Sequence, residues 1–430
     1  MPAHPSTITL SNFRGLDNKN SSERLPEGFL DAIDNIDVDA RGSLRTREGY
    51  TKIISGTNVH SLFSYDDKYL IYIDNGELIV YNKDTAAGVT TYTSSYIDSK
   101  VDYLKIQDRI YFSSLDYNGI LDTTTNTVRP WGIPYPLKQP SLSSLSVGNL
   151  TEGIYQVVTT NVSIDGRESG AYLASTISIN NNNSIQLTGI ATTHSDTTIS
   201  STNIYCSTSN GDILYLIGNI PLGTSTFTIS NVSQATRALA SQFLSDAPKG
   251  ELVSLYNGRV FLAQDNLLLY SEPHAYELFK TSSNFIQFEK PITNIMPVDD
   301  GIFITADKLY FLEGHTPETF RLREREPYGG IKRTAVKIVG SDIVLENIPT
   351  GFKWLFSSTK GIVMVGSGGM VFNLTEKSVM LDKSDEGAAI FKSQGGINQY
   401  LSVLKDPDNT RLHVGDSVSA EIIRNGITIT

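Results

Sequence analysis

The chain is patterned as short apolar strands separated by polar turns, in a unit that recurs along its length. Each copy reads as a strand, a polar turn, an apolar strand, a second turn and a strand that carries an aromatic residue. The copies occupy residues 61–82, 103–122, 252–271, 294–314 and 353–374. Because such a unit buries one face against the next copy, radial repetition is typical of a β-propeller. The pattern therefore predicts an all-β chain that contains an irregular propeller of about six or seven blades.

The repeat is interrupted once, by a segment in which aromatic residues thin out and Ser, Thr and Asn dominate. Two hairpin signals lie in this segment, the dipeptides Asp165-Gly166 and Asn210-Gly211, each flanked by strand-like residues. Several short alternating strands over about a hundred residues are typical of a β-sandwich. We therefore expect an inserted sandwich of fibronectin type III or immunoglobulin character.

Turn-rich segments at 134–140 and 247–251 flank this interruption and suit domain boundaries. The predicted division is an N-terminal part of the propeller, the inserted sandwich, and a C-terminal part of the propeller, over residues 1–137, 138–246 and 247–430. We expect the first and last strands of the propeller to pair, because pairing would close the ring and leave no free edge.

Two further local patterns carry expectations. In residues 32–39 apolar and polar residues alternate, a Gly turn follows at Gly42, and a second strand-like run returns, which predicts a hairpin. Residues 233–244 place apolar side chains at Ala235, Leu239, Phe243 and Leu244, which makes this segment one of few plausible helices.

The charge balance limits the classes of partner. The chain has 35 Lys and Arg against 46 Asp and Glu, a net charge of −11. This argues against a broad nucleic-acid-binding face, which needs clustered cations, but it is compatible with a wall along which DNA slides. The single cysteine, Cys206, excludes a disulfide framework. No apolar run approaches the roughly 18 residues of a membrane span, so we expect a protein that folds in a reducing cytoplasm without a membrane span.

Candidate catalytic motifs are few, and each has a simpler structural interpretation. Asp37 and Asp39 alternate on one predicted strand and lack the spacing of a calcium loop. Ser357 and Lys360 fit an S-x-x-K pattern without its companion motifs, and they fall on a predicted turn. The histidines show no spacing typical of a metal or base site: His4, His60, His194, His274, His315 and His413. The residues therefore predict no enzyme and no cofactor.

One segment, 321–333, concentrates charge, with the sequence RLREREPYGGIKR. Its interleaved glutamates oppose phosphate binding, so a nucleic-acid site is disfavoured. Two interpretations stay open, a solvated strand or a contact with another subunit or partner, where complementary charges would give specificity. The candidate contact residues are Arg321, Arg323, Glu324, Arg325, Glu326, Lys332 and Arg333.

The N-terminal block resembles the opening of tail nozzle proteins of short-tailed bacteriophages, the tail tubular protein B or tail-hub type. That opening reads as leucine-proline, an alanine-rich turn, N-[IV]-D-[IVL]-D, a Gly turn and [RK]-x-R-x-G-[YF]. The matching residues are Leu25, Pro26, Ala32, Asn35, Ile36, Asp37, Val38, Asp39, Gly42, Arg45, Arg47, Gly49 and Tyr50. Residues 153–170 look like the fibronectin-like domain of those proteins, and residues 330–343 and 351–369 resemble their closing blades.

The resemblance implies a non-enzymatic virion protein that is assembled in the host cytoplasm and works as a homo-oligomeric ring in the tail, a hexamer by analogy. Such a ring lies below the portal and adaptor proteins, extends the DNA-ejection channel and supports tail fibres or spikes and the needle. The family has no catalytic residues to transfer to this chain.

Two other functions stay open at this point. A receptor-binding tail protein would recognise host-surface carbohydrate and should expose aromatic rings on the sandwich, whereas residues 177–186 are polar and poor in rings. A propeller glycoside hydrolase is less favoured, because it would need paired carboxylates at a central opening.

Overall fold

The computed structural model describes residues 12–39, 41–47, 49, 51–92, 97–338, 351–394, 397–405, 418–423 and 426–429. Over these residues the chain is all-β, as predicted, and its helices are two single 3-10 turns, η1 (Ser22–Arg24) and η2 (Pro317–Thr319). None of the described helices has the length and apolar character needed to cross a membrane.

The chain divides into two compact units, which are described separately. The first, here the insert unit, comprises Gly56–Gln264 and Leu268–Ile286, and the second, here the hairpin unit, comprises Met1–Ser55, Asp265–Leu267 and Gln287–Thr430. The predicted domain boundaries at residues 137 and 246 are not tested by this division into two units and stay a prediction.

The insert unit contains three sheets of consecutive antiparallel strands, and their hairpins are those of the repeated sequence unit. The first has β5 (His60–Ser64), β6 (Tyr69–Asp74), β7 (Glu77–Asn82) and β8 (Ala87–Tyr92). The second has β9 (Asp102–Ile106), β10 (Arg109–Ser113), β11 (Asn118–Asp122) and β12 (Thr127–Pro130). The third has β20 (Leu252–Tyr256), β21 (Arg259–Gln264), β22 (Leu267–Glu272) and β23 (Ala275–Phe279), with β24 (Phe285–Gln287) added beside β22.

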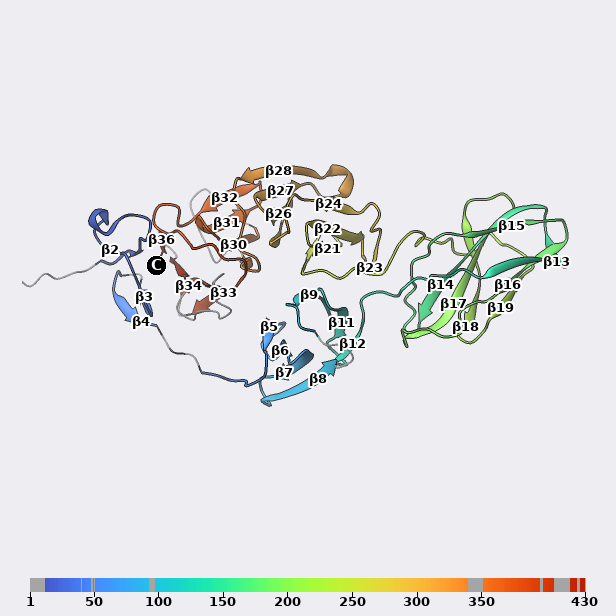
Figure 1. Ribbon diagram of the computed structural model, residues 1–430, viewed down its shortest axis with the longest axis horizontal. Coiled ribbons are helices and arrows are strands. Elements are labelled where there is room, and N and C mark those ends of the chain that lie inside the picture. The colour runs from blue at the N-terminus through green and yellow to red at the C-terminus, as the bar shows by residue number, and fades with distance from the viewer. Residues whose placement is uncertain are drawn as a thin grey trace, which may run out of the picture. The chain divides into compact units, whose positions relative to one another are not determined.

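The hairpin unit contains three more such sheets, labelled in part in Figure 1. The first has β25 (Asn294–Val298), β26 (Gly301–Thr305), β27 (Leu309–Glu313) and β28 (Arg321–Glu326). The second has β29 (Val336–Ile338), β30 (Lys353–Ser358), β31 (Gly361–Gly366) and β32 (Met370–Asn373). The third has β33 (Gly387–Gln394), β34 (Ile397–Leu404), β35 (Val418–Ile423) and β36 (Gly426–Ile429). Inner strands β26 and β31 are buried throughout, which explains their continuous apolar sequences.

The N-terminal hairpin forms as predicted. Strand β3 (Ile36–Val38) pairs with β4 (Leu44–Thr46), and a short parallel pair, β1 (Gly15–Leu16) and β2 (Phe29–Leu30), precedes it. The Asp39 carboxylate accepts the backbone N–H groups of Arg41 and Ser43, both at 2.9 Å, and so closes the turn. Asp37 accepts a hydrogen bond from Arg47 across the hairpin at 2.9 Å.

The N-terminal segment is held to the C-terminal part of the hairpin unit by a side-chain amide. Asn18 donates through Nδ2 to the Met380 carbonyl and accepts the Met380 N–H on Oδ1, both at 2.9 Å. Leu16 packs against a buried cluster that contains Val379 and Leu404. The prediction that the first and last strands pair is wrong for the described residues, where each meander sheet consists of strands close in sequence.

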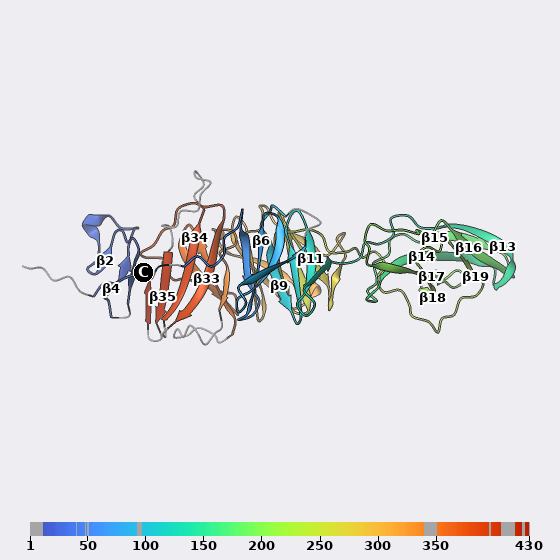
Figure 2. The same ribbon diagram turned by 90° about the horizontal axis from the view of Figure 1, so that it is seen from below.

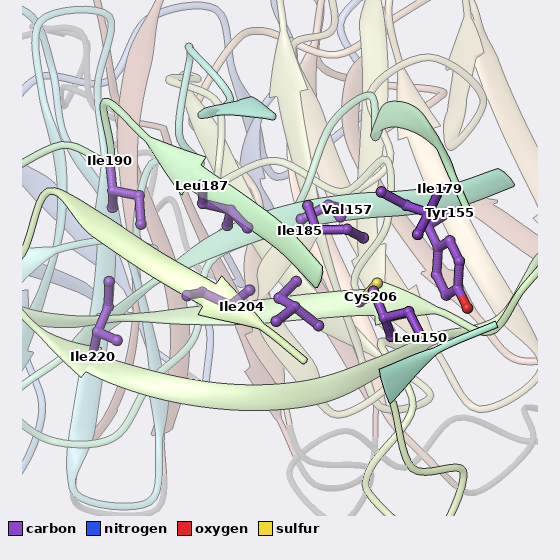
Figure 3. Packing of buried hydrophobic residues seen from close by; sticks show 11 residues of the cluster. Leu150, Tyr155, Val157, Ile179, Ile185, Leu187, Ile190, Ile204, Cys206 and Ile220 are labelled. Carbon is purple, nitrogen blue, oxygen red and sulfur yellow. The ribbon is translucent and has the colours of Figure 1, made fainter. Parts of the chain in front are cut away.

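The interruption in the repeat folds as two sheets that share one core. One sheet has the order β13 (Ser141–Leu150), β16 (Asn183–Thr188), β19 (Thr226–Ile229), and the other has β15 (Ser175–Ile179), β14 (Gly153–Ser163), β17 (Ile199–Ser207), β18 (Leu214–Pro221). Figure 2 shows both from the side. Figure 3 shows their buried side chains, among them Ile185 and Leu187 from the first sheet and Val157, Ile204 and Cys206 from the second. Cys206 is a fully buried core residue.

The two hairpin signals of this insert have different outcomes. Asn210-Gly211 lies in the turn between the paired strands β17 and β18, as predicted. At Asp165-Gly166 the chain turns tightly, but the returning segment makes only a single bridge, Val162 with Glu168. The returning segment is short but hydrogen-bonded to β14, because the Ser163 N–H donates to the Arg167 carbonyl and the Ser169 N–H to the Asn161 carbonyl, both at 2.9 Å.

The predicted helix at residues 233–244 does not form. The Arg237 carbonyl accepts the Leu216 N–H at 2.9 Å, and the Leu239 N–H donates to the Leu214 carbonyl at 2.8 Å. These bonds use the free edge of β18, and Leu239 packs against the buried cluster around Tyr205. The apolar spacing that resembles a helix therefore belongs to an irregular covering segment, residues 233–247.

The insert is joined to the neighbouring sheets of its unit by buried aromatic packing. Trp131 is 1% exposed and donates its indole N–H to the Tyr276 carbonyl at 2.8 Å. Its ring lies 5.2 Å from that of Tyr111 and 6.3 Å from that of Phe279, between centroids. Ser245 and Phe279 exchange two backbone hydrogen bonds, of 2.8 and 2.9 Å. Both chain crossings into the insert are thus fixed to β23.

An ion network reinforces this joint. Arg167 donates to Asp165 at 2.9 Å and to Glu277 at 2.8 Å, and Arg129 also pairs with Asp165. Burial acts to raise the pKa of Asp165, but the hydrogen bond from Ser163 and the charge of Arg167 outweigh it and leave that pKa below its usual value. The Asp165 turn of the insert is therefore bound, as a carboxylate, to cations that face the neighbouring sheets.

We predict that Asp165→Asn destabilises the protein at neutral pH by about 1 kcal/mol, because it removes a charged acceptor from two partly buried arginines. A lowered folded-state pKa means that this contribution is complete above the unfolded pKa of about 3.9 and is lost as the pH falls through the folded pKa. Denaturant unfolding followed by tryptophan fluorescence across pH 3–7 measures it. The control is Asp84→Asn, whose partner Lys68 lies 3.6 Å away in an exposed pair. Equal stability of Asp165→Asn and the control at pH 7 would contradict the prediction.

Candidate functional site

The dense charge run lies mainly on β28, the outermost strand of its sheet. Residues Arg321 to Arg325 are all exposed. In the antiparallel register with β27, Arg321 lies opposite Glu313, Arg323 opposite Phe311 and Glu324 opposite Tyr310. Because side chains alternate along a strand, the arginines before the bulge share one face and Glu324 takes the other.

Much of this charge is matched within the same sheet or the next one. Arg323 pairs with Glu313 at 2.8 Å, and Lys308 pairs with Glu324 at 2.8 Å. The Glu324 carboxylate accepts a hydrogen bond from Lys308 and raises the pKa of that lysine. Arg325 donates to the Gly369 carbonyl at 2.5 Å, in the turn after β31. The run is therefore an exposed strand with local partners.

Lys332 and Arg333 do not share this surface. The Lys332 carbonyl accepts the Gly387 N–H at 2.9 Å, and the Arg333 side chain, 14% exposed, pairs with Glu386 at 3.1 Å. These two residues connect the start of β33 to the segment before β29. The structure thus separates the candidate contact residues into an exposed strand and a structural corner.

The charge pattern of β28 opposes pairing with the same strand of a second copy. In a two-fold antiparallel pair, residues opposite each other come from the same face of the sheet. In a register centred on Leu322, Arg321 of each copy would face Arg323 of the other, which is destabilising. The register also shifts at Arg325, and such a bulge is a common protection of an edge strand. If β28 contacts another subunit, it meets a different surface.

The residues of the enzyme-like motifs have structural roles. Ser357, in the S-x-x-K pattern, lies at the end of β30, and its hydroxyl is 3.0 Å from the Tyr400 hydroxyl and 3.1 Å from that of Ser402 in a buried network. The glycines at 366–369 form the turn between β31 and β32. Over the described part of the chain, no group of three or more His, Cys, Asp or Glu side chains is arranged to hold a metal ion.

A hollow of about 590 Å³ lies in the insert unit beside the ion network, and its wall includes carboxylates. Asp122 accepts the Thr124 hydroxyl at 2.5 Å and the Thr124 N–H at 2.9 Å, and these bonds lower its pKa. Glu277 is bonded to Arg167. A glycosidase general acid needs a raised pKa, so Asp122 does not suit that role.

A second surface, missed by the sequence reasoning, lies where the covering segment meets the insert. The rings of Tyr135 and Tyr172 stack with centroids 5.7 Å apart. Tyr172 is 52% exposed, Phe243 47%, Leu173 60% and Leu137 93%. We call these five residues the aromatic patch. None of the five is charged.

Three segments distant in sequence build the aromatic patch. The Ala171 N–H donates to the Ser241 carbonyl at 3.0 Å, and the Phe243 N–H donates to the Ala171 carbonyl at 2.5 Å. This approach requires a glycine, because a Cβ at Gly170 would lie 1.8 Å from the Leu244 carbonyl oxygen. Asn161 fixes the third segment by donating to the Pro134 carbonyl at 2.8 Å.

Phe243 has an unusual backbone conformation. Its φ is +63°, in the left-handed region that a bulky L-residue rarely adopts. Strain of this kind persists only where the surrounding contacts impose it, and it concentrates at functional positions. In the sequence Phe243 matched a helical apolar position, so no local signal indicated an exposed ring.

No protein-family model matches this sequence, and no curated protein matches it. Among solved structures, the chain is similar to BBS1N in complex with ARL6DN, with a TM-score of 0.33 and 10% identity over 89% of this chain and 98% of that one. It is similar to Sqt1 of Saccharomyces cerevisiae, with a TM-score of 0.25 and 13% identity over 73% and 84%. For Hsv2 of Kluyveromyces lactis the values are 0.27 and 9% over 80% and 92%. These TM-scores are too low to support a shared function.

We predict that the two parts of the charge run respond differently to loss of charge. Arg333→Met should lower the free energy of unfolding by about 1–2 kcal/mol, because it leaves the partly buried Glu386 without its charged donor. The matched variant Arg323→Met, in an exposed pair, should change it by less than about 0.5 kcal/mol. Denaturant unfolding of the two variants compares them, and indistinguishable effects would refute the separation into corner and surface.

Proposed function

We propose that this chain is a structural subunit of the tail of a short-tailed bacteriophage, a nozzle-type protein whose copies form a ring around the DNA-ejection channel. The observation that carries the proposal is the N-terminal hairpin, since the residues that carry the family resemblance have definite roles in it. Asn35 adopts a φ of +55° and its carbonyl accepts the Arg47 N–H at 3.0 Å. Asp37 pairs with Arg47, and Asp39 closes the turn.

Gly42 is a further residue of the motif with a definite role in the hairpin. Its φ is +75°, and a Cβ there would lie 2.7 Å from the Asn12 Cα, so the position requires a glycine. The motif thus encodes one specific hairpin, and Asn18 holds the same N-terminal block against the segment before the last sheet. Parts of the resemblance lie outside this support, since Tyr50 and residues 339–343 are not among the described residues.

The proposed architecture is a propeller with an inserted fibronectin-like sandwich. Its support is the set of six meander sheets over the described residues, each of which matches a blade in strand order, and the two-sheet insert between the second and third. In this proposal the blades surround an axis and the copies assemble as a ring, a hexamer by analogy. The ring contacts adaptor or portal proteins on one side and fibres, spikes or the needle on the other.

The acidic composition fits this role. With a net charge of −11, a channel wall formed by this chain repels phosphate, so that DNA passes without binding. The chemistry needed is non-covalent, and the protein acts in the virion tail after assembly in the host cytoplasm.

A second candidate function is favoured by one observation. A carbohydrate-binding tail protein should expose aromatic rings on the insert, and Tyr172 and Phe243 are such rings. Affinity electrophoresis with the purified surface polysaccharide of the host tests it. Unchanged mobility of the protein at saturating polysaccharide would exclude this function.

The proposed function predicts rings. Purified full-length protein, imaged by electron microscopy over a concentration series, should form closed rings with an opening wide enough for duplex DNA, and the same density should appear in the tails of intact virions. A strict monomer at the highest concentration, together with no density in the tail, would overturn the proposal.

A further inference from the structure

We propose that the hollow beside the ion network is a binding site for a short uncharged saccharide. This inference goes beyond the structural role proposed above and does not depend on ring assembly. It gives a carbohydrate ligand a defined place in the molecule.

The hollow has the size and the position of a small-molecule site. Its volume is about 590 Å³, and ligand pockets usually measure about 300–1,000 Å³. Three parts of the insert unit form its wall: the second meander sheet, the insert at Arg167 and Glu168, and the third meander sheet at residues 274–278. Ligand sites occur preferentially where such parts meet. Arg167 donates to Glu277 at 2.8 Å, so the insert and β23 are held together at the wall.

The charges on the wall oppose an anionic ligand. The wall carries two arginines, Arg109 and Arg167, and four carboxylates, those of Asp108, Asp122, Glu168 and Glu277. Arg109 lies directly opposite Asp122 in the register of β10 and β11, so its charge is matched by a neighbour. A phosphate or carboxylate in the hollow would therefore meet an excess of negative charge, which is unfavourable.

The same carboxylates are poorly suited to a metal ion. Three of the four are bound by donors of the protein itself, Asp122 by Thr124, Glu277 by Arg167, and Glu168 by Asn203 and Tyr205. No group of His, Cys, Asp or Glu in the described part of the chain is arranged to hold a metal ion. The ligand that this wall favours is therefore uncharged and forms hydrogen bonds.

The rest of the wall suits the hydroxyl groups and the C–H faces of sugar rings. Gln107 brings both a donor and an acceptor in its side-chain amide. The rings of Tyr111 and Tyr276 have centroids 6.0 Å apart, and those of Tyr276 and His274 6.4 Å apart. The negative face of an aromatic ring attracts the polarised C–H groups of a sugar. A few polar groups placed beside aromatic rings are the usual lining of a ligand site.

The wall also holds two side chains at left-handed backbone positions. Gln107 has a φ of +54° in the two-residue turn between β9 and β10, and His274 has a φ of +57°. The matching turn of the third sheet uses Asn257 and Gly258, which adopt this conformation readily. Glutamine in such a position is strained, and strain of this kind concentrates at functional sites. The His274 ring lies over Gly258, where a Cβ would be 2.8 Å from its Cε1.

The first test is a glycan array that carries uncharged di- to tetrasaccharides beside the same saccharides extended by a sialic or uronic acid. Full-length protein should bind uncharged members, and it should bind their acidic counterparts at least about tenfold more weakly, because of the carboxylates on the wall. Titration calorimetry with the best uncharged saccharide should give affinities that differ by less than about twofold between about 0.05 and 0.5 M NaCl, since salt screens only charged contacts.

The second test locates the saccharide in the hollow. Gln107→Gly removes the amide and places at φ +54° the residue that adopts this conformation most readily, so the fold should be retained, as a melting curve checks. The affinity should fall about three- to tenfold, as expected for the loss of one hydrogen bond. His274→Gly, at φ +57°, should also weaken binding. The control is Asn75→Gly, the same kind of change at φ +48° in the turn between β6 and β7, which should leave the affinity unchanged.

The outcomes separate this inference from the proposed function. Protein that binds no uncharged saccharide on the array would overturn the inference, and rings seen by electron microscopy would still support the proposed function. Tighter binding of the acidic members would overturn the choice of ligand. Binding that is as strong in Gln107→Gly and His274→Gly as in Asn75→Gly would assign the saccharide to another surface and overturn the role of the hollow.

Discussion

The constraint on which this structure depends is that every strand edge must be paired, covered or protected. Each meander sheet is built from strands close in sequence, so each leaves edges that expose backbone N–H and C=O groups. The chain meets the constraint in more than one way. At β18 the covering segment adds hydrogen bonds through Arg237 and Leu239. At β28 a row of charged side chains and a bulge protect the edge.

The covering segment has consequences beyond the edge that it pairs. Because it continues past Leu239, it brings residues 241–244 against Ala171, and the approach at Gly170 is close enough to exclude any side chain there. Gly170 thereby sets the position of Tyr172 and Phe243. The same segment enters the joint through Ser245, whose backbone pairs with Phe279. A feature that satisfies backbone hydrogen bonds therefore also places the aromatic patch and anchors the insert.

The parts of the fold that could be predicted from sequence are those specified locally. The Asn210-Gly211 hairpin, the repeated meander strands and the Asp39 turn each depend on residues within a few positions of one another. The contacts that were missed join distant residues. Asn18 bonds to Met380, and Phe243 bonds to Ala171, and neither pairing leaves a periodic signal in the chain. The expected helix failed for this reason, since Leu239 packs against the cluster around Tyr205 while Ala235 and Phe243 are exposed.

The candidate site shows the same difference between features that are specified locally and contacts between distant residues. The charge run was visible as a local pattern, but the pattern alone did not reveal that Arg333 lies in a corner with Glu386 while Arg323 lies on an exposed strand. On the strand, Arg321 and Arg323 share one face and Glu324 takes the other, while the shift at Arg325 brings Glu326, opposite Leu309, onto the face of the two arginines. The two arginines disfavour pairing of β28 with the same strand of a second copy, because their like charges would lie opposite each other. The surface that attracts attention in the sequence is thus better suited to keeping copies apart along that edge, whereas the exposed rings of Tyr172 and Phe243 are brought near each other only by contacts between distant segments.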